Sequence, residues 1–213
     1  MQKVVVASQL ASAVYEKCDV AIARAKALGF DEDVFFWSHA DTQAMLCESA
    51  DEAWLVWRGT EPTSFMDIWH NLSWPRLEKW AGEGRIHSGY KDAFNMLRPA
   101  IDTVIAGIRK PLYVTGHSMG GALATVYCSA NPMMPTALYS FCATKSLDQK
   151  AADQVICETN VIGNKYDVAV YWPPVPGLVH VDERIHVGSG NWYNPLARHS
   201  MGYMCKAVEK QYG

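Results

Sequence analysis

The chain has 213 residues, of which 49% are hydrophobic and 19% charged. This length and composition are typical of a single globular domain over residues 1–213 and exclude an intrinsically disordered chain. The formal net charge of −3 gives no electrostatic reason to bind nucleic acid, and no apolar run approaches the roughly 18 residues of a transmembrane segment.

The start of the chain does not resemble a signal peptide, because its apolar run is too short and Lys3 is the only positive charge before Glu16. We therefore expect a protein that stays inside the cell, is released by lysis, or has lost a leader; the compartment stays open. The six cysteines show no C-x-x-C pair and no ligand spacing with histidine. They predict buried free thiols, with neither a metal site nor a cofactor.

The first third of the chain predicts a helix followed by three strands. Apolar residues at every fourth position predict one helix from about Ala7 to Leu28, ended by Gly29. Two alternating stretches, Phe35–His39 and Thr42–Glu48, then predict a strand pair. Ala53–Trp57 is almost continuously apolar, which indicates a central strand.

Residues 61–89 hold three of the eight tryptophans, Trp69, Trp74 and Trp80, without a persistent helical or strand period. They indicate either a loop that covers the core or a partly mobile cover over an apolar site. Tyr90–Arg109 has helical spacing, and Pro99 within it is expected to kink or divide the helix.

A nucleophile-elbow pattern occupies the middle of the chain. The apolar, β-branched stretch Leu112–Thr115 predicts a buried strand. A G-x-S-x-G turn with a second glycine follows at Gly116–Gly121, and the small residues of Ala122–Tyr127 then predict a helix. Such a strained turn holds a serine hydroxyl out at the carboxyl end of a strand. Ser118 is therefore the candidate nucleophile.

The rest of the chain continues to alternate strands with helices. The expected strands are Ala137–Cys142, Asn160–Ile162 and Arg184–Val187; the expected helices are Ala151–Cys157 and a final one N-capped by Ser200. This alternation predicts an α/β fold with a central, mostly parallel mixed sheet covered by helices on both faces.

A serine hydroxyl needs a base, and a histidine needs an acid that fixes its tautomer. In α/β hydrolases the chain order is serine, acid, histidine, which leaves His180, His186 and His199 as bases. His199, on the loop entering the last helix, is favoured over His186, which lies in an expected strand. For the acid, Asp167 in the turn after a strand is favoured over Asp182.

Motifs along nearly the whole chain resemble the class 3 lipases, the fungal-lipase-like branch of the α/β-hydrolase fold. The matching residues are Leu10-Ala11, Tyr15, Thr42-Gln43-Ala44, Trp57–Thr60, Asp67, Asn71-Leu72, His87–Tyr90, Gly116–Gly121, Asn164, Asp167, His199–Met201 and Tyr203. The resemblance implies Ser118 as nucleophile, Asp167 as acid and His199 as base. It also implies that Thr60 joins Met119 in the oxyanion hole.

The oxyanion assignment also has a physical argument. Charge that develops on a carbonyl oxygen needs preorganised donors, and the Met119 N–H lies at the start of a helix. A second donor must come from the end of an earlier strand, where Thr60 falls with an N–H and a hydroxyl.

Two stretches depart from the family. Phe141–Thr144 stands where the family usually carries Gly-x-Pro-x-x-Gly-Asn, so the floor behind the acid is expected to be built differently. Residues 61–66, where the family places its lid, offer little material, so any cover is expected to be small.

These observations predict a serine carboxylic-ester hydrolase that acts on acylglycerol-like or simple apolar esters through an acyl-enzyme. A lipid ester is the expected partner, with transient contact at a lipid interface. Two alternatives remain at the level of sequence. One is phospholipase, feruloyl-type esterase or acyltransferase chemistry at the same site; the other is a lipase-like scaffold that binds without turnover.

Overall fold

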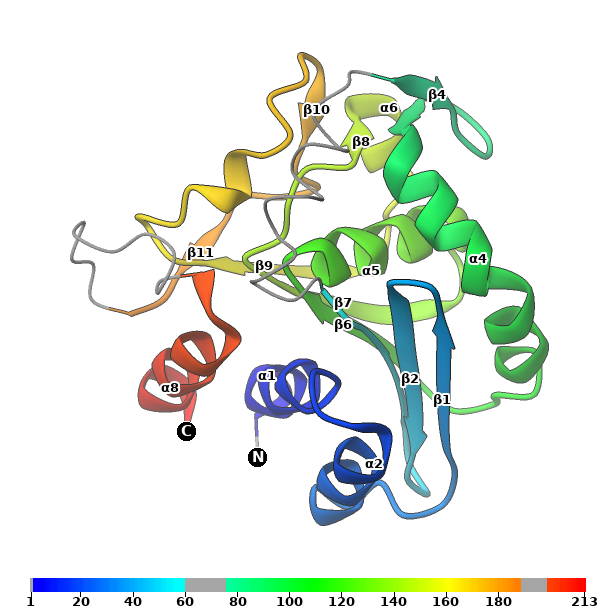
Figure 1. The fold of residues 1–213 in the computed structure, drawn as a ribbon, viewed down its shortest axis with the longest axis vertical. Helices are drawn as coiled ribbons and strands as arrows, with labels where there is room; N and C mark the ends of the chain where they lie inside the picture. The colour runs from blue at the N-terminus through cyan, green and yellow to red at the C-terminus, as the bar shows by residue number, and fades with distance from the viewer. Residues whose placement is uncertain (1, 60–75, 189–198) are drawn as a thin grey trace.

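The computed structural model describes residues 2–59, 76–188 and 199–213, and its centre is a seven-stranded sheet (Figure 1). The strand order is β1-β2-β3-β6-β7-β9-β11. The first three strands pair antiparallel and the others pair parallel, which confirms the mostly parallel mixed sheet. The strands are β1 Val34–His39, β2 Thr42–Glu48, β3 Ala53–Trp57, β6 Leu112–His117, β7 Pro135–Phe141, β9 Glu158–Gly163 and β11 Ile185–His186.

Helices cover both faces of this sheet, as predicted (Figure 1). On one face lie α4 (Ser88–Ile105) and α5 (Met119–Ala130), and on the other lie α1 (Lys3–Ala13), α2 (Cys18–Ala27) and α8 (Met201–Tyr212). Each face has its own cluster of buried apolar side chains. Small residues dominate α5, and ten of its residues are buried, so this helix packs directly on β3, β6 and β7.

The prediction of one helix from Ala7 to Leu28 is wrong, because the chain breaks between α1 and α2. Leu10 and Val14 are buried against the sheet, but Cys18 is exposed, and α2 buries Ala21 and Ala25 instead. The apolar residues at every fourth position therefore do not lie on one continuous helix face. Gly29, with a φ of +94°, does follow the end of α2 as predicted.

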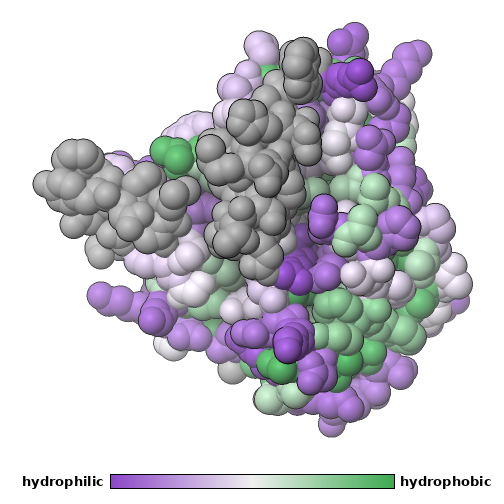
Figure 2. Space-filling view, in the orientation of Figure 1, coloured by the Kyte–Doolittle hydropathy of each residue, from purple (hydrophilic) through white to green (hydrophobic). Residues whose placement is uncertain are grey.

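The hairpin of β1 and β2 and the buried central strand β3 confirm the other predictions for this third of the chain. Figure 2 shows hydrophilic side chains around much of the visible rim, with hydrophobic ones gathered near this hairpin.

At the other end of the chain, the Ser200 hydroxyl accepts the Tyr203 N–H at 3.3 Å, so Ser200 caps α8 as expected.

A second, four-stranded antiparallel sheet, in the order β10-β8-β5-β4, accounts for elements that the sequence did not reveal. Its strands are β4 Leu77–Lys79, β5 Arg85–His87, β8 Leu147–Asp148 and β10 Leu178–Val179. Each has only two or three residues, too few to show a period. The loop prediction for residues 61–89 is therefore wrong at β4 and β5.

Pro99 lies inside α4, which is not divided there. One helix prediction needs correction. The helix expected at Ala151–Cys157 is the single turn α6, Gln149–Ala152, capped by the side chain of Asp148, and a short 3-10 turn, Ala169–Tyr171, follows β9. Within the described residues, no helix has the length and apolar character needed to cross a membrane.

Candidate active site

Ser118 lies in a sharp turn between β6 and α5. Its φ of 58° and ψ of −126° are unusual for a residue other than glycine, and its backbone N–H donates to the Phe141 carbonyl at 2.9 Å. The strand ends at His117 and the helix begins at Met119. This strand-turn-helix geometry is that of a nucleophile elbow.

Glycines allow the end of β3 to approach this turn closely. A Cβ atom on Gly120 would lie 2.2 Å from the Trp57 carbonyl oxygen, and one on Gly59 would lie 2.4 Å from the His117 carbonyl oxygen. Both distances are below any real carbon contact. Glycine is therefore required where β3 and the elbow meet.

Parallel strands bring distant residues to the same edge of the sheet as Ser118. In the register, Trp57 pairs with Gly116, His117 with Phe141, and Phe141 with Ile162. The residues that follow these strands therefore surround the elbow, and Asp167 lies in the turn after β9.

His199 connects Ser118 to Asp167. Its Nε2 lies 2.7 Å from Ser118 Oγ and its Nδ1 lies 2.8 Å from Asp167 Oδ2. Because a carboxylate can only accept, Nδ1 carries the proton and the neutral ring accepts the serine O–H at Nε2. The side chain of Asp167 is fully buried and that of His199 is 12% exposed.

The charge of Asp167 is stabilised despite its burial. Burial opposes ionisation, but the hydrogen bond and electrostatic interaction with His199, together with the Ala169 N–H, outweigh it and lower the pKa of Asp167. Oδ1 accepts the Ala169 N–H at 2.9 Å. Asp167 is therefore held as a carboxylate.

Residues 54–156 match the model of the family described as "Lipase (class 3)". This stretch, just under half of the chain, is similar to the class 3 lipases. Among solved structures, the chain is similar to the Rhizomucor miehei lipase in complex with its propeptide (21% identity, TM-score 0.68), covering 87% of this chain and 67% of that one. It is also similar to the mono- and diacylglycerol lipase of Aspergillus oryzae, at 14% identity and a TM-score of 0.73. That match covers 90% of this chain and 82% of the Aspergillus lipase. No curated protein matches the chain.

In this fold, the alternative candidates for base and acid lie away from Ser118, with other partners. His180 Nε2 lies 2.8 Å from the Val170 carbonyl oxygen, and burial lowers the pKa of this histidine. His186 is exposed on β11. Asp182, the alternative acid, accepts the Thr159 hydroxyl at 2.7 Å.

Sequence reasoning excluded His117 as a base and did not foresee where it lies. Its Nε2 lies 2.6 Å from the His199 carbonyl oxygen and its Nδ1 lies 2.8 Å from the Tyr15 hydroxyl. Burial, and then the nearby His199, lower the pKa of His117 to about 3, so it stays neutral. Its place beside Ser118 in the elbow was the available signal.

The stretch Phe141–Thr144 departs from the family pattern in sequence, and its backbone has an unusual conformation. Cys142 has a φ of +47°, in the left-handed region that glycine favours. Thr144 is buried and accepts the Tyr90 hydroxyl at 2.6 Å.

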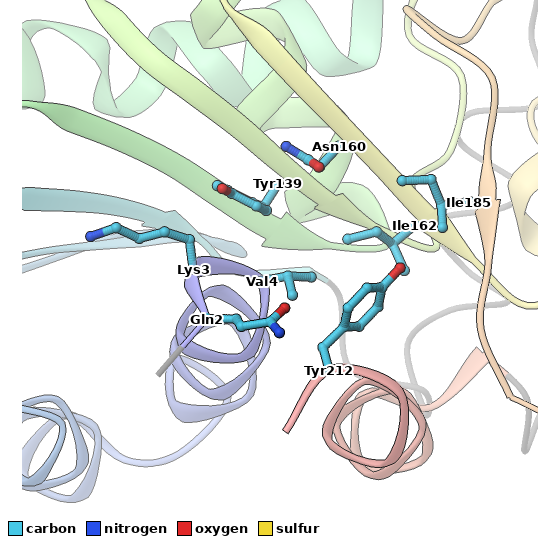
Figure 3. Close-up of a pocket in the computed structure, with 8 residues that line it drawn as sticks. All are labelled: Gln2, Lys3, Val4, Tyr139, Asn160, Ile162, Ile185 and Tyr212. Atoms are coloured by element: carbon cyan, nitrogen blue, oxygen red, sulfur yellow. The ribbon is translucent and has the colours of Figure 1, made fainter.

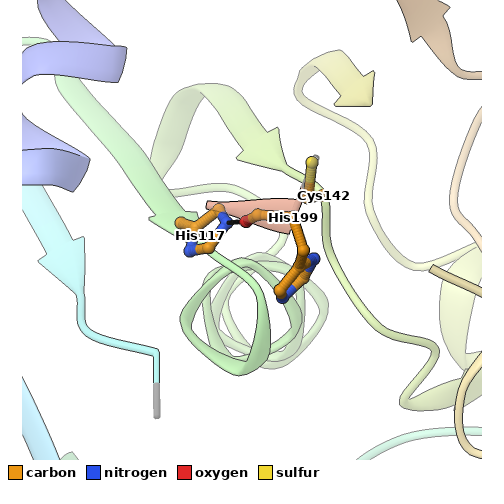
Figure 4. A group of neighbouring side chains, drawn as sticks. All are labelled: His117, Cys142 and His199. Atoms are coloured by element: carbon orange, nitrogen blue, oxygen red, sulfur yellow. Dashed lines mark hydrogen bonds between the residues drawn. The ribbon is translucent and has the colours of Figure 1, made fainter. Parts of the chain in front are cut away.

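His117, Cys142 and His199 place ligand-type atoms within 4.8 Å of one another (Figure 4). The ring nitrogens of both histidines already take part in hydrogen bonds. The donor set thus suits the hydrogen-bond network better than a metal ion. All six cysteines, each among the described residues, are free, and Cys18 is exposed rather than buried.

Met119 is the first residue of α5, where backbone N–H groups point toward the helix start. The other expected oxyanion donor, Thr60, lies outside the described residues. So does the lid stretch with Trp69 and Trp74.

A separate pocket of about 220 Å³ lies between the start of α1 and the end of α8 (Figure 3). None of its lining residues belongs to the Ser118–His199–Asp167 set.

Proposed function

We propose that the protein is a serine carboxylic-ester hydrolase, a lipase or esterase that acts through Ser118, His199 and Asp167. The observation that carries this proposal is the continuous hydrogen-bond chain from Ser118 Oγ through His199 to the buried Asp167 carboxylate. A hydroxyl, an imidazole and a carboxylate in this order are the parts of a nucleophilic acyl-transfer site.

In the proposed reaction, His199 Nε2 takes the Ser118 proton while Oγ attacks the ester carbonyl carbon. Asp167 holds the Nδ1 tautomer and stabilises the imidazolium that forms. Collapse of the tetrahedral intermediate breaks the ester C–O bond, and His199 returns the proton to the leaving alcohol. Water then attacks the acyl-enzyme by the same path and releases the acid.

The tetrahedral intermediate carries a negative oxygen that needs donors. Met119 supplies its backbone N–H from the start of α5, and Thr60 is the proposed second donor. Gly59 supports this assignment, because it lies directly before Thr60 and approaches the elbow closely.

Acylglycerol-like or simple apolar esters are the proposed substrates, with transient contact at a lipid interface. The match of residues 54–156 to the class 3 lipases supports lipid esters, and one similar structure is named a mono- and diacylglycerol lipase. The residues proposed to act run from Thr60, which comes after β3 in the chain, to His199, just before α8; this spread supports one α/β-hydrolase domain over residues 1–213.

The proposal is tested with Ser118→Ala on a series of p-nitrophenyl esters of increasing chain length, and with a fluorophosphonate probe that labels activated serines. The wild type should hydrolyse the esters and be labelled at Ser118, and the variant should do neither. Ser140→Ala is the matched control: this buried serine in β7 has no hydrogen-bond partner for its hydroxyl among the described residues, so activity should persist. Wild-type hydrolysis by Ser118→Ala would overturn the proposal.

A further inference from the structure

His117 contacts the proposed base, His199, in two ways (Figure 4). Its Nε2 lies 2.6 Å from the His199 carbonyl oxygen, and the two imidazole rings lie 4.8 Å apart between centroids, at an angle of 39°. His117 is buried, is the last residue of β6 and directly precedes Ser118. One side chain therefore contacts both the main chain and the ring of His199 from a place beside the proposed nucleophile.

Tyr15 sets the direction of the hydrogen bonds of His117. The Tyr15 hydroxyl lies 2.8 Å from Nδ1 of His117. Because the His199 carbonyl can only accept, the proton of His117 is on Nε2, and Nδ1 accepts the O–H of Tyr15. A hydroxyl that donates to Nδ1 keeps the proton on Nε2, so the contact with the His199 carbonyl stays attractive.

Tyr15 lies in the turn after α1 and packs against the segment that follows β3. The guanidinium carbon of Arg58 lies 5.5 Å from the centre of the Tyr15 ring. A Cβ atom on Gly59 would overlap the Tyr15 hydroxyl oxygen, so this hydroxyl fills the space beside Gly59. Gly59 directly precedes Thr60, the proposed oxyanion donor. Tyr15 therefore contacts this segment as well as His117.

The electrostatic state of His117 suits a place beside a base that gains a proton. Burial, followed by the nearby His199, lowers the pKa of His117 to about 3, so its ring is neutral near pH 7. A neutral ring does not repel the imidazolium that His199 forms in the proposed reaction. His117 can thus remain in contact with His199 in both of its protonation states.

We propose that Tyr15 and His117 form a positioning pair that holds the main chain of His199. The imidazole of His199 then stays between Ser118 and Asp167. This inference rests on the proposed ester hydrolysis. The ring nitrogens of His117 bond to Tyr15 and to the His199 carbonyl, so the pair acts through His199 and not on the substrate. Such support matters because a misplacement of about 1 Å can slow a reaction about 100-fold.

Replacement of His117 tests the contact with the base. His117→Leu removes the donor to the His199 carbonyl, so kcat for a p-nitrophenyl ester should fall about 10- to 100-fold with KM changed less than about twofold. His117→Gln should recover most of kcat, because its amide nitrogen can donate from the position of Nε2. His180→Leu is the matched control: His180 Nε2 lies 2.8 Å from another backbone carbonyl, that of Val170. Its kcat should stay within about twofold of wild type.

Replacement of Tyr15 tests the pair without disturbing the core. Tyr15→Phe removes one oxygen atom and keeps the ring, and kcat should fall about 3- to 10-fold, as expected for one lost hydrogen bond. Tyr127→Phe is the matched control, because this hydroxyl bonds the Met134 sulfur near the end of α5. The double variant of Tyr15→Phe and His117→Leu should lose no more kcat than His117→Leu alone. Additive losses would contradict the pairing.

Proton NMR keeps this inference separate from the proposed function. The low-field signal of the His199 Nδ1–H, which bonds Asp167, can be observed without substrate. Its exchange with solvent should be faster in His117→Leu and Tyr15→Phe, and close to wild type in His117→Gln and both control variants. That pattern in a protein without ester hydrolysis would defeat the proposed function alone. Folded His117→Leu and Tyr15→Phe with wild-type kcat and exchange, or an equal loss of kcat in the controls, would overturn the positioning pair.

Discussion

The His117 Nε2 atom lies 2.6 Å from the backbone carbonyl oxygen of His199, so the residue before the proposed nucleophile holds the chain that carries the proposed base. Since a carbonyl only accepts, Nε2 is protonated and Nδ1 accepts the Tyr15 hydroxyl. One buried, neutral imidazole thus connects three segments: the break after α1, the end of β6 and the entrance to α8.

This arrangement predicts a pH-dependent contribution to stability. The pKa of His117 is about 3 in the folded protein and near 6.5 when unfolded, so the unfolded chain binds the extra proton. The stabilisation is complete above about pH 6.5 and is lost as pH falls toward 3, by about 1.4 kcal/mol per unit. The free energy of unfolding, measured in urea from pH 7 to 4, should converge between wild type and His117→Gln. If the free energies of unfolding of wild type and His117→Gln instead differ by the same amount at every pH, His117 makes no such contribution.

Loss of the proposed acid should abolish most turnover without unfolding the protein. Asp167→Asn presents an amide that can donate to His199 and favour the wrong tautomer, and kcat should fall by roughly 10⁴. Asp182→Asn is the matched control, because this carboxylate bonds Thr159 instead of a histidine. Equal activity of the two variants, measured on one p-nitrophenyl ester, would exclude Asp167 as the acid.

Removal of a second oxyanion donor should act on the chemical step. Thr60→Ala should lower kcat by about 10²–10³ if the Thr60 hydroxyl stabilises the intermediate, and Thr60→Ser should retain most activity. KM should change little, since the interaction strengthens only as charge develops. If Thr60→Ala retains wild-type kcat, its side chain has no such role, and a backbone N–H is the remaining donor.

Two glycine substitutions should have opposite effects on stability. Gly120→Ala places a Cβ 2.2 Å from the Trp57 carbonyl, so backbone must move, and the free energy of unfolding should fall by several kcal/mol. A Cβ atom added at Gly202 in α8 would meet no atom within 4 Å. Gly202→Ala should therefore raise the free energy of unfolding by up to about 1 kcal/mol. Thermal unfolding of the two variants distinguishes them, and a neutral Gly120→Ala would mean that the close approach is not required.

Local patterns predicted most elements near the site because those elements are long or strongly patterned. The β1–β2 hairpin, the buried strand β3 and the capped helix α8 all have a clear period or cap. The break between α1 and α2 was missed because Cys18 and Ile22 continue an apolar spacing that the sheet does not bury. Strands of two or three residues, such as β5 and β8, have no period to detect.

By itself, the sequence determined the chemical types and their order: a serine in a glycine-rich elbow, then an acid, then a histidine, within an α/β pattern. Those signals depend only on neighbouring residues or on their order along the chain, so they can be recognised without the three-dimensional structure. Only the tertiary structure decided which side chains meet. The parallel register brings the ends of β6, β7 and β9 to one edge, and there His199 lies between Ser118 and Asp167, with His117 against the His199 carbonyl. Contacts between residues far apart in the chain depend on that register, and no local spacing encodes it.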